Sequence, residues 1–297
     1  MVNSEIDHQI KYLSQRFSAG VARENEANAS FAKDHSFFVE NCKSPMEYYE
    51  DGVSNAYIEY PEFLKQYPGK KLKILDIGVG RGESSVYLAS LGHQVFSIEP
   101  SKDFCRLIAQ IKNKFSLNIT PVCSVAEEMG QLNESNFDLV IFNSSLHHCD
   151  NPDIALHQAY LMLKPNGKVF LSSEIQLKPW VNKSAWYRRL ETHPEEMGHY
   201  GGNEHAYFNW EYSRMLKGAG FQKVDTFPSV QFLRPLVRIA LELKSDRYNP
   251  LKGTAGFKYF LRIMYYFAAS VVANNHWLFQ PLAKLSLLPG QYVGEKL

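Results

Sequence analysis

Short runs of apolar residues alternate along the chain with stretches in which apolar residues recur at helical spacing. An apolar run at 72–77 is followed by glycines, by an amphipathic stretch at 83–91 and by a second apolar run at 95–98. Strands that are buried on both faces read as nearly continuous apolar runs, whereas a repeat of about 3.6 residues marks a helix. This order predicts an α/β fold, in which helices cover both faces of a parallel sheet.

The alternation continues further along the chain. Pro152 stands at the start of an apolar repeat and suits the first turn of a helix. Asn166 and Gly167 end that helix, since both residues tolerate the left-handed backbone of a turn. The other elements that we expect are helices at 102–114 and 210–217 and strands at 118–122, 137–143, 168–173 and 221–227.

Glycines dominate the turn after the first of these strands. Gly78, Gly80 and Gly82 follow the strand, and Glu99 ends the next one. Glycines let a ligand approach the backbone closely, and an acid at the end of the second strand accepts hydrogen bonds from ribose hydroxyls. The arrangement predicts a mononucleotide-binding half-fold.

Glu83 argues against a dinucleotide as the ligand. The dinucleotide fingerprint has a glycine at its sixth position, where the pyrophosphate meets the start of the helix. Counting from Gly78, the sixth residue is Glu83, whose carboxylate would repel a diphosphate. An NAD(P)-dependent oxidoreductase is therefore the less favoured alternative. A phosphate-free nucleoside with a cationic amino acid tail suits this turn better.

The motif Asp76-x-Gly78-x-Gly80-x-Gly82 resembles the first motif of the class I S-adenosylmethionine-dependent methyltransferases. The stretch at 137–152 is also similar to this family, in its methyltransferases acting on small molecules and lipids. It has Phe-Asp-Leu-Val entering a strand, a small polar pair, Leu-His-His and an Asn-Pro helix start. The resemblance covers about residues 71–227. It implies a doubly wound, seven-stranded, mostly parallel sheet with S-adenosyl-L-methionine as the cofactor.

The resemblance also implies which residues bind the cofactor. Asn143 and Ser144, at the end of the fourth strand, would face its methionine part, and Ala126 with Glu127 would edge the adenine. A plain loop with a helix start is the alternative for the latter pair. The expected cofactor-binding residues are Asp76, Gly78, Val79, Gly80, Gly82, Glu99, Pro100, Ala126, Glu127, Asn143 and Ser144.

Three residues are candidates for the chemistry. His205 and His148 could act as a general base towards an acceptor hydroxyl, and Glu204 could face the acceptor. In the alternative, His148 only shapes the pocket floor, Glu204 caps the next helix and His205 packs on its first turn. His193, His199 and His205 are spaced by six residues, which fits no known zinc pattern, so we expect no metal.

These patterns predict that the chain is divided into three parts. Residues 1–66 are expected to form a helical cap over the cofactor, or a helical layer at the sheet edge. Residues 67–228 would form the Rossmann-like core, with a substrate lid inserted at 175–208. Residues 229–297 would hold a helical insertion and, at 291–294, a last edge strand.

The predicted insertion contains a strongly apolar run at 259–273. This run is shorter than the about 20 apolar residues that span a bilayer, and it contains Arg262. A helical pair that packs on the core or forms a homodimer is one interpretation. A surface for a lipophilic acceptor or a peripheral membrane contact is the other.

Composition and charge limit the classes of partner and the cellular location that we expect for the protein. The 297 residues carry a net charge of +1, which gives no field to attract nucleic acid. Four cysteines without a close pair are expected as free thiols, and the N-terminus shows no signal peptide, so we expect a cytoplasmic protein. The predicted function is O- or N-methylation of an apolar or natural-product-like small molecule. A partner subunit that binds the cofactor without catalysis is the alternative.

Overall fold

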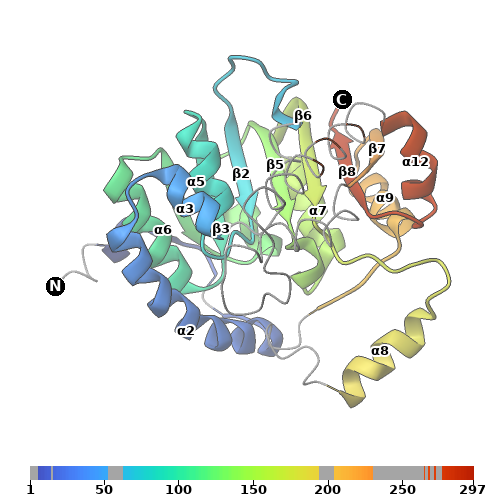
Figure 1. Ribbon diagram of the computed structural model, residues 1–297, viewed down its shortest axis with the longest axis horizontal. Coiled ribbons are helices and arrows are strands. Elements are labelled where there is room, and N and C mark those ends of the chain that lie inside the picture. Colours follow the sequence, from blue (N-terminus) through green and yellow to red (C-terminus); the bar gives the residue numbers. More distant parts are fainter. Residues whose placement is uncertain are drawn as a thin grey trace.

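An eight-stranded sheet forms the centre of the protein in the computed structural model (Figure 1). The structure describes residues 6–14, 16–52, 63–193, 204–229, 264, 267, 271 and 276–297. The strand order is β1-β4-β3-β2-β5-β6-β8-β7, and every pairing is parallel except the two made by β8. The strands are β1 (Lys11–Tyr12), β2 (Lys73–Ile77), β3 (Gln94–Glu99), β4 (Ile119–Cys123), β5 (Phe137–Asn143), β6 (Leu163–Ser172), β7 (Lys223–Pro228) and β8 (Gly290–Glu295).

Helices cover both faces of this sheet, and each face has its own apolar core (Figure 1). Alternate residues of a strand point to opposite faces, so Leu75 and Ile77 join the core beneath α7 and α9, whereas Ile74 joins the core beneath α5 and α6. The helices are α2 (Ala19–Asn41), α3 (Pro45–Gly52), α5 (Glu83–Ser90), α6 (Lys102–Phe115), α7 (Pro152–Met162), α8 (Lys183–Thr192), α9 (Asn209–Gly218) and α12 (His276–Lys284), with short 3-10 turns η2 (Ala126–Gln131) and η3 (Leu146–His148).

The helix starts are set by local chemistry. The side chain of Asn151 accepts a hydrogen bond from the backbone N–H of Ile154 at 3.1 Å, with Pro152 in the first turn of α7. Ser101 caps α6 in the same way through the N–H of Phe104. Such caps satisfy backbone donors that a helix start leaves without partners. The doubly wound α/β class is confirmed.

The strand count and the place of the last strand differ from the prediction. Residues 291–294 were expected at an edge, but β8 lies between β6 and β7 and is antiparallel to both. Tyr292 is fully buried there, and a side chain at Gly294 would come within 2.8 Å of Phe221. The eighth strand is β1, two residues beside β4 in a region where only helices were expected.

Strand β6 also begins earlier than expected. It starts at Leu163 and includes the predicted turn, with Asn166 in the expected left-handed conformation at φ 59°. The register with β5 shifts between Phe137 and Leu139, which absorbs the irregular residues.

The sheet reverses its winding direction at β2. The chain runs from β2 outward to β3 and β4, and then returns to the other side of β2 at β5. Loops that leave the ends of β2 and β5 therefore diverge, and ligands of open α/β sheets bind in the crevice at this switch point.

The predicted helical insertion lies mostly outside the described residues. Its described end is α12, which packs against β7 and α9. Within the described parts of the chain, no helix combines the length and the apolar character needed to cross a bilayer.

Candidate functional site

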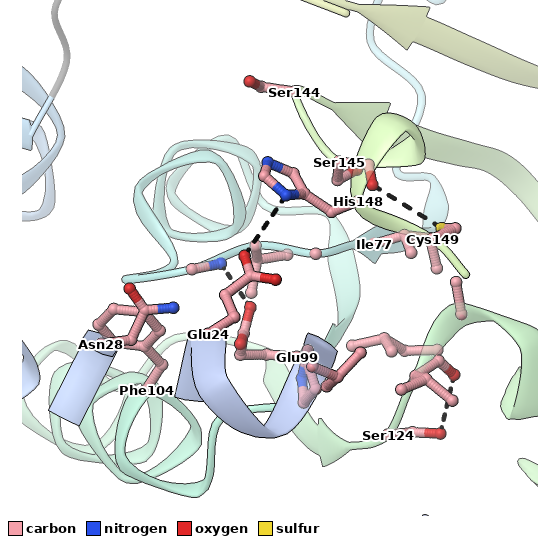
Figure 2. Close-up of a pocket in the computed structure, with 18 of the residues that line it drawn as sticks. Glu24, Asn28, Ile77, Glu99, Phe104, Ser124, Ser144, Ser145, His148 and Cys149 are labelled. Atoms are coloured by element: carbon pink, nitrogen blue, oxygen red, sulfur yellow. Dashed lines mark hydrogen bonds and ion pairs between the residues drawn. The ribbon is translucent and has the colours of Figure 1, made fainter. Parts of the chain in front are cut away.

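A cavity of about 660 Å³ lies at the carboxyl ends of β2, β3 and β5, at the switch point of the sheet (Figure 2). Its walls come from the glycine turn after β2, the acid that ends β3, the segments after β4 and β5, and helix α2. The volume is that of a small-molecule or cofactor site.

The glycine turn forms one wall. Gly78 has φ 63°, and a Cβ there would lie 2.5 Å from the Cβ of Ser145 on the loop after β5. Its N–H donates to the carbonyl of Ile98 at 2.8 Å. A residue with a side chain would therefore push the two loops apart, so glycine is required by sterics as well as by the backbone angle.

Glu99 is fixed before any ligand binds. Its two carboxylate oxygens accept hydrogen bonds from the backbone N–H groups of Gly80, at 2.8 Å, and Ser101, at 2.9 Å. The side chain is buried, and burial raises the pKa of Glu99 to about 7, against the effect of those two amides. The strand end and the glycine turn thus hold an acceptor group at the cavity wall.

Helix α2 covers the cavity from the N-terminal side. Val21, Glu24 and Asn28 line it, and a carboxylate oxygen of Glu24 lies 3.5 Å from Nδ1 of His148. Burial, together with the nearby charge of Glu99, raises the pKa of Glu24 to about 8. Figure 2 shows Glu24 between Glu99 and His148. The helix also packs along α6, so it serves both as a layer and as a wall of the site.

Most of the residues predicted to bind the cofactor meet at this cavity. His148, a candidate base, lines it too. The nine predicted cofactor residues that line it are Gly78, Val79, Gly80, Glu99, Pro100, Ala126, Glu127, Asn143 and Ser144.

Asp76 and Gly82 do not line the cavity. Asp76 is 1% exposed and points to the α5 face of the sheet, where its Oδ2 accepts hydrogen bonds from Ser84 and Ser85, both at 2.7 Å. Gly82 begins α5 with φ 86°, and a Cβ there would lie 2.6 Å from a side-chain carbon of Ile108. Both residues therefore hold α5 against the sheet and take no part in the cavity wall, and their contact with the cofactor stays a prediction.

Glu83 lines the cavity wall, next to the glycine turn, as its sixth position in the motif predicts. It pairs with Arg81 at 2.6 Å between Nη2 and Oε1, so part of its charge is neutralised. Repulsion of a diphosphate would therefore come from the partly neutralised Glu83, and from Glu24 and Glu99 at a pH high enough to ionise them.

His147 and Glu174 are residues that the sequence reasoning did not select. Glu174 is buried and accepts three backbone N–H hydrogen bonds, from Ser145, Leu146 and His147, at 3.0 to 3.2 Å. Its Oε2 also lies 2.7 Å from Nδ1 of His147. An acid that directly follows an apolar strand identified Glu99, and the same signal is present at Glu174.

Glu204 and His205 reach the same region from the segment before α9. The N–H of His205 donates to the carbonyl of His147 at 2.9 Å. Donor atoms of His147, His148 and Glu204 all lie within 4.8 Å of one another. Burial raises the pKa of Glu204 and lowers the pKa of His205.

One part of the alternative interpretation is thereby decided. Glu204 does not cap the next helix, since α9 begins at Asn209 and Glu211 accepts the hydrogen bond from the N–H of Phe208. Neither Glu204 nor His205 lines the cavity itself, whereas His148 does. His193 lies at the end of α8 and His199 lies outside the described residues, so the evenly spaced histidines form no described cluster.

Comparisons with known proteins agree with this geometry. Residues 75–171 match the family described as a methyltransferase domain. The ubiquinone biosynthesis O-methyltransferase of Hydrogenovibrio crunogenus is 31% identical over 38% of this chain and 47% of its own length. The mitochondrial enzyme of that name from Rattus norvegicus is 32% identical over 36% of this chain and 32% of its own length. The chain thus spans less than half the length of these relatives.

Solved structures show the same fold. Phosphoethanolamine N-methyltransferase 2 of Haemonchus contortus, in complex with phosphomonomethylethanolamine and S-adenosylhomocysteine, gives a TM-score of 0.53 at 18% identity, over 81% of this chain and 52% of that one. The [4+2]-cyclase SpnF gives a TM-score of 0.50 at 18% identity, over 81% and 82%. The stretch at 75–171 that matches the methyltransferase-domain family runs from β2 to β6, the strands around this cavity.

Proposed function

We propose that the protein binds S-adenosyl-L-methionine in the switch-point cavity and methylates a small-molecule acceptor. The observation that carries the proposal is the fixed carboxylate of Glu99 beside the glycine turn, on the wall of a cavity of cofactor size. The printed names of the relatives, ubiquinone biosynthesis O-methyltransferases, support it, as does the S-adenosylhomocysteine in a structural neighbour.

The residues present fit this cofactor. Glu99 would accept hydrogen bonds from the ribose hydroxyls, and Ala126 with Glu127 would edge the base. Gly78 and Gly80 line the cavity without side chains, so the methionine part could approach the backbone of this turn closely. A bound cation would also favour the ionised forms of Glu24 and Glu99 at the wall, whereas an anion would not.

Bound S-adenosylmethionine supplies a methyl group on a sulfonium, and transfer leaves the electron pair of the broken bond on a neutral sulfur. The protein then has to hold the acceptor in line and exclude water, which helix α2 does from one side. An acceptor hydroxyl must also lose its proton as the new O–C bond forms. His148 takes the first place as base, ahead of His205, since it lines the cavity and lies beside Glu24.

Calorimetric titration tests the proposal. S-adenosylmethionine and its demethylated product should bind one to one, and NADH should not bind. Saturable NADH binding without S-adenosylmethionine binding would overturn it in favour of an oxidoreductase. Mass spectrometry of a panel of phenols and amines incubated with the methyl donor should then show a product 14 Da heavier.

A cofactor-binding protein that transfers no methyl group is the second candidate. It is supported by SpnF, which has this fold and is named as a [4+2]-cyclase. The fold therefore does not fix the reaction. Cofactor binding without any methylated product across the panel would favour it.

The partner assignments stay predictions. They comprise a lipophilic acceptor, a peripheral membrane contact, a homodimer through residues 229–288 and a cytoplasmic location.

A further inference from the structure

Two histidines and a carboxylate from separate segments meet beside the cavity. We propose that His147, His148 and Glu204 bind a divalent transition-metal ion, with Zn²⁺ the best match to their chemistry. Their donor atoms lie within 4.8 Å of one another, so one ion between them needs only small side-chain movements. Imidazole and carboxylate donors suit Zn²⁺, and two histidines with one glutamate form a known ligand set for sites with an open fourth position.

His147 already has the orientation of a metal ligand. Its Nδ1 lies 2.7 Å from Glu174, and this carboxylate is itself fixed by three backbone N–H groups. Such a carboxylate takes the proton-bearing nitrogen of the ring and leaves Nε2 with a lone pair for an ion. The ring is 2% exposed, so it cannot turn away into solvent.

His148 repeats this arrangement with a second carboxylate. Its Nδ1 lies 3.5 Å from Glu24 of helix α2, and the ring centroids of the two histidines are 4.3 Å apart. Figure 2 shows one ring nitrogen of His148 turned towards Glu24 and the other turned away from it. Each histidine of the proposed site thus has a carboxylate behind it, which is the usual support of metal-binding histidines.

Glu204 is held in reach by the backbone. The hydrogen bond from the N–H of His205 to the carbonyl of His147 ties the segment before α9 to η3. This bond fixes the carboxylate of Glu204 next to the two rings, although the residues are more than fifty positions apart in the sequence.

The open position of the ion would face the cavity, because His148 lines it. In this role the inference rests on the proposed function. A bound Zn²⁺ would hold the acceptor oxygen and lower the pKa of its hydroxyl, so that the proton leaves to water before the oxygen attacks the methyl group. With the ion bound, His148 would be a metal ligand and would no longer be the base. Metal binding itself does not depend on methyl transfer.

The test measures metal binding without cofactor, on the full chain freed of any polyhistidine tag and stripped with a chelator. Co²⁺ is the spectroscopic probe, and Zn²⁺ competition gives the affinity. We expect one equivalent of Co²⁺ with the visible absorption of a four-coordinate site. Glu204→Gln and His147→Asn should each weaken Co²⁺ binding at least tenfold.

His193→Asn is the matched control, since His193 is exposed and lies outside the cluster. It should bind Co²⁺ like the wild type. Wild-type protein that binds no stoichiometric Co²⁺, or a Glu204→Gln variant that binds it unchanged, overturns the metal site. Calorimetry of S-adenosylmethionine with the metal-free protein separates this failure from a failure of the proposed function.

Discussion

The two sides of the cavity are built in opposite ways. The glycine-turn side comes from one continuous stretch, from β2 to Ser101 just after β3, and Glu99 is held by backbone hydrogen bonds within that stretch. The side beyond β5 brings together η3, Glu174 after β6 and Glu204 before α9. The first side has the features of a fold that is found in enzymes with many different reactions. The second side is assembled from distant segments, and there a change of one residue can alter the chemistry.

A substitution in the turn should give the largest effect. Gly78→Ala places a methyl group 2.5 Å from Ser145 and forces a left-handed angle on alanine. We expect the free energy of unfolding to fall by about 3 kcal/mol and cofactor binding to be lost. Urea unfolding and calorimetry measure the two effects.

Gly69→Ala is the matched control for this change. Gly69 has φ 67°, but a Cβ at this position would meet no atom within 4 Å. Its loss should be about 1 kcal/mol, from the backbone angle alone. Equal losses in both variants would show that the contact between the turn and the β5 loop does not constrain the site.

A change at Glu174 tests the side of the cavity beyond β5, which is assembled from distant segments. Glu174→Ala leaves three backbone N–H groups and His147 without their acceptor in the buried region. We expect a loss of about 3 kcal/mol in urea unfolding, while the affinity for S-adenosylmethionine changes by less than about threefold. Glu191→Ala, on the exposed end of α8, should change neither quantity. A loss of cofactor affinity equal to that of a turn variant would mean that the two sides are not separable.

A change at Glu99 tests how the glycine-turn side of the cavity contributes to cofactor affinity. The pKa of Glu99 is about 7 in the free protein, and ribose hydroxyls donate best to the ionised carboxylate. Affinity should therefore fall as the pH drops below 7. Glu99→Gln should weaken binding by about 2 kcal/mol, or about 30-fold, at pH 8 and remove the part of this pH dependence that comes from Glu99, leaving that of Glu24. Calorimetry between pH 6 and 8 measures both, with Glu40→Gln on the exposed end of α2 as the control.

Asp76 gives the smallest expected effect. Burial raises its pKa to about 6, so the folded protein keeps a proton that the unfolded chain has already released between about pH 4 and 6. The free energy of unfolding therefore falls as the pH rises through this range. Asp76→Asn should remove up to about 1 kcal/mol per pH unit of that slope. An identical slope in the variant and the wild type would show that the pKa of Asp76 is not raised in the folded protein.

The comparison also explains what the sequence could and could not predict. Strands β2 to β7, the glycine turn and Glu99 were predicted, because each depends on residues close together in the chain. The direction of the Asp76 side chain was not predicted, because the motif gives only the spacing of its residues. In a strand whose Leu75 and Ile77 face one core, the residue between them must face the other.

Long-range contacts account for the rest. Nothing near Glu174 or Glu204 indicates that both reach His147, since that depends on the path of the chain around β6 and α9. The position of β8 inside the sheet is likewise a matter of strand order, which a short run of apolar residues does not encode.

The insertion of β8 between β6 and β7 has a consequence for how the chain folds. Among the described strands, β7 pairs with β8 alone, so its hydrogen-bonding edge stays open until β8, which begins 62 residues after the end of β7, has come into place. Closing so long a loop costs entropy before any contact repays it, which delays the completion of this end of the sheet. Until then β7 and the far side of β6 are open edges at which two unfinished chains could pair, so refolding yield should fall as protein concentration rises.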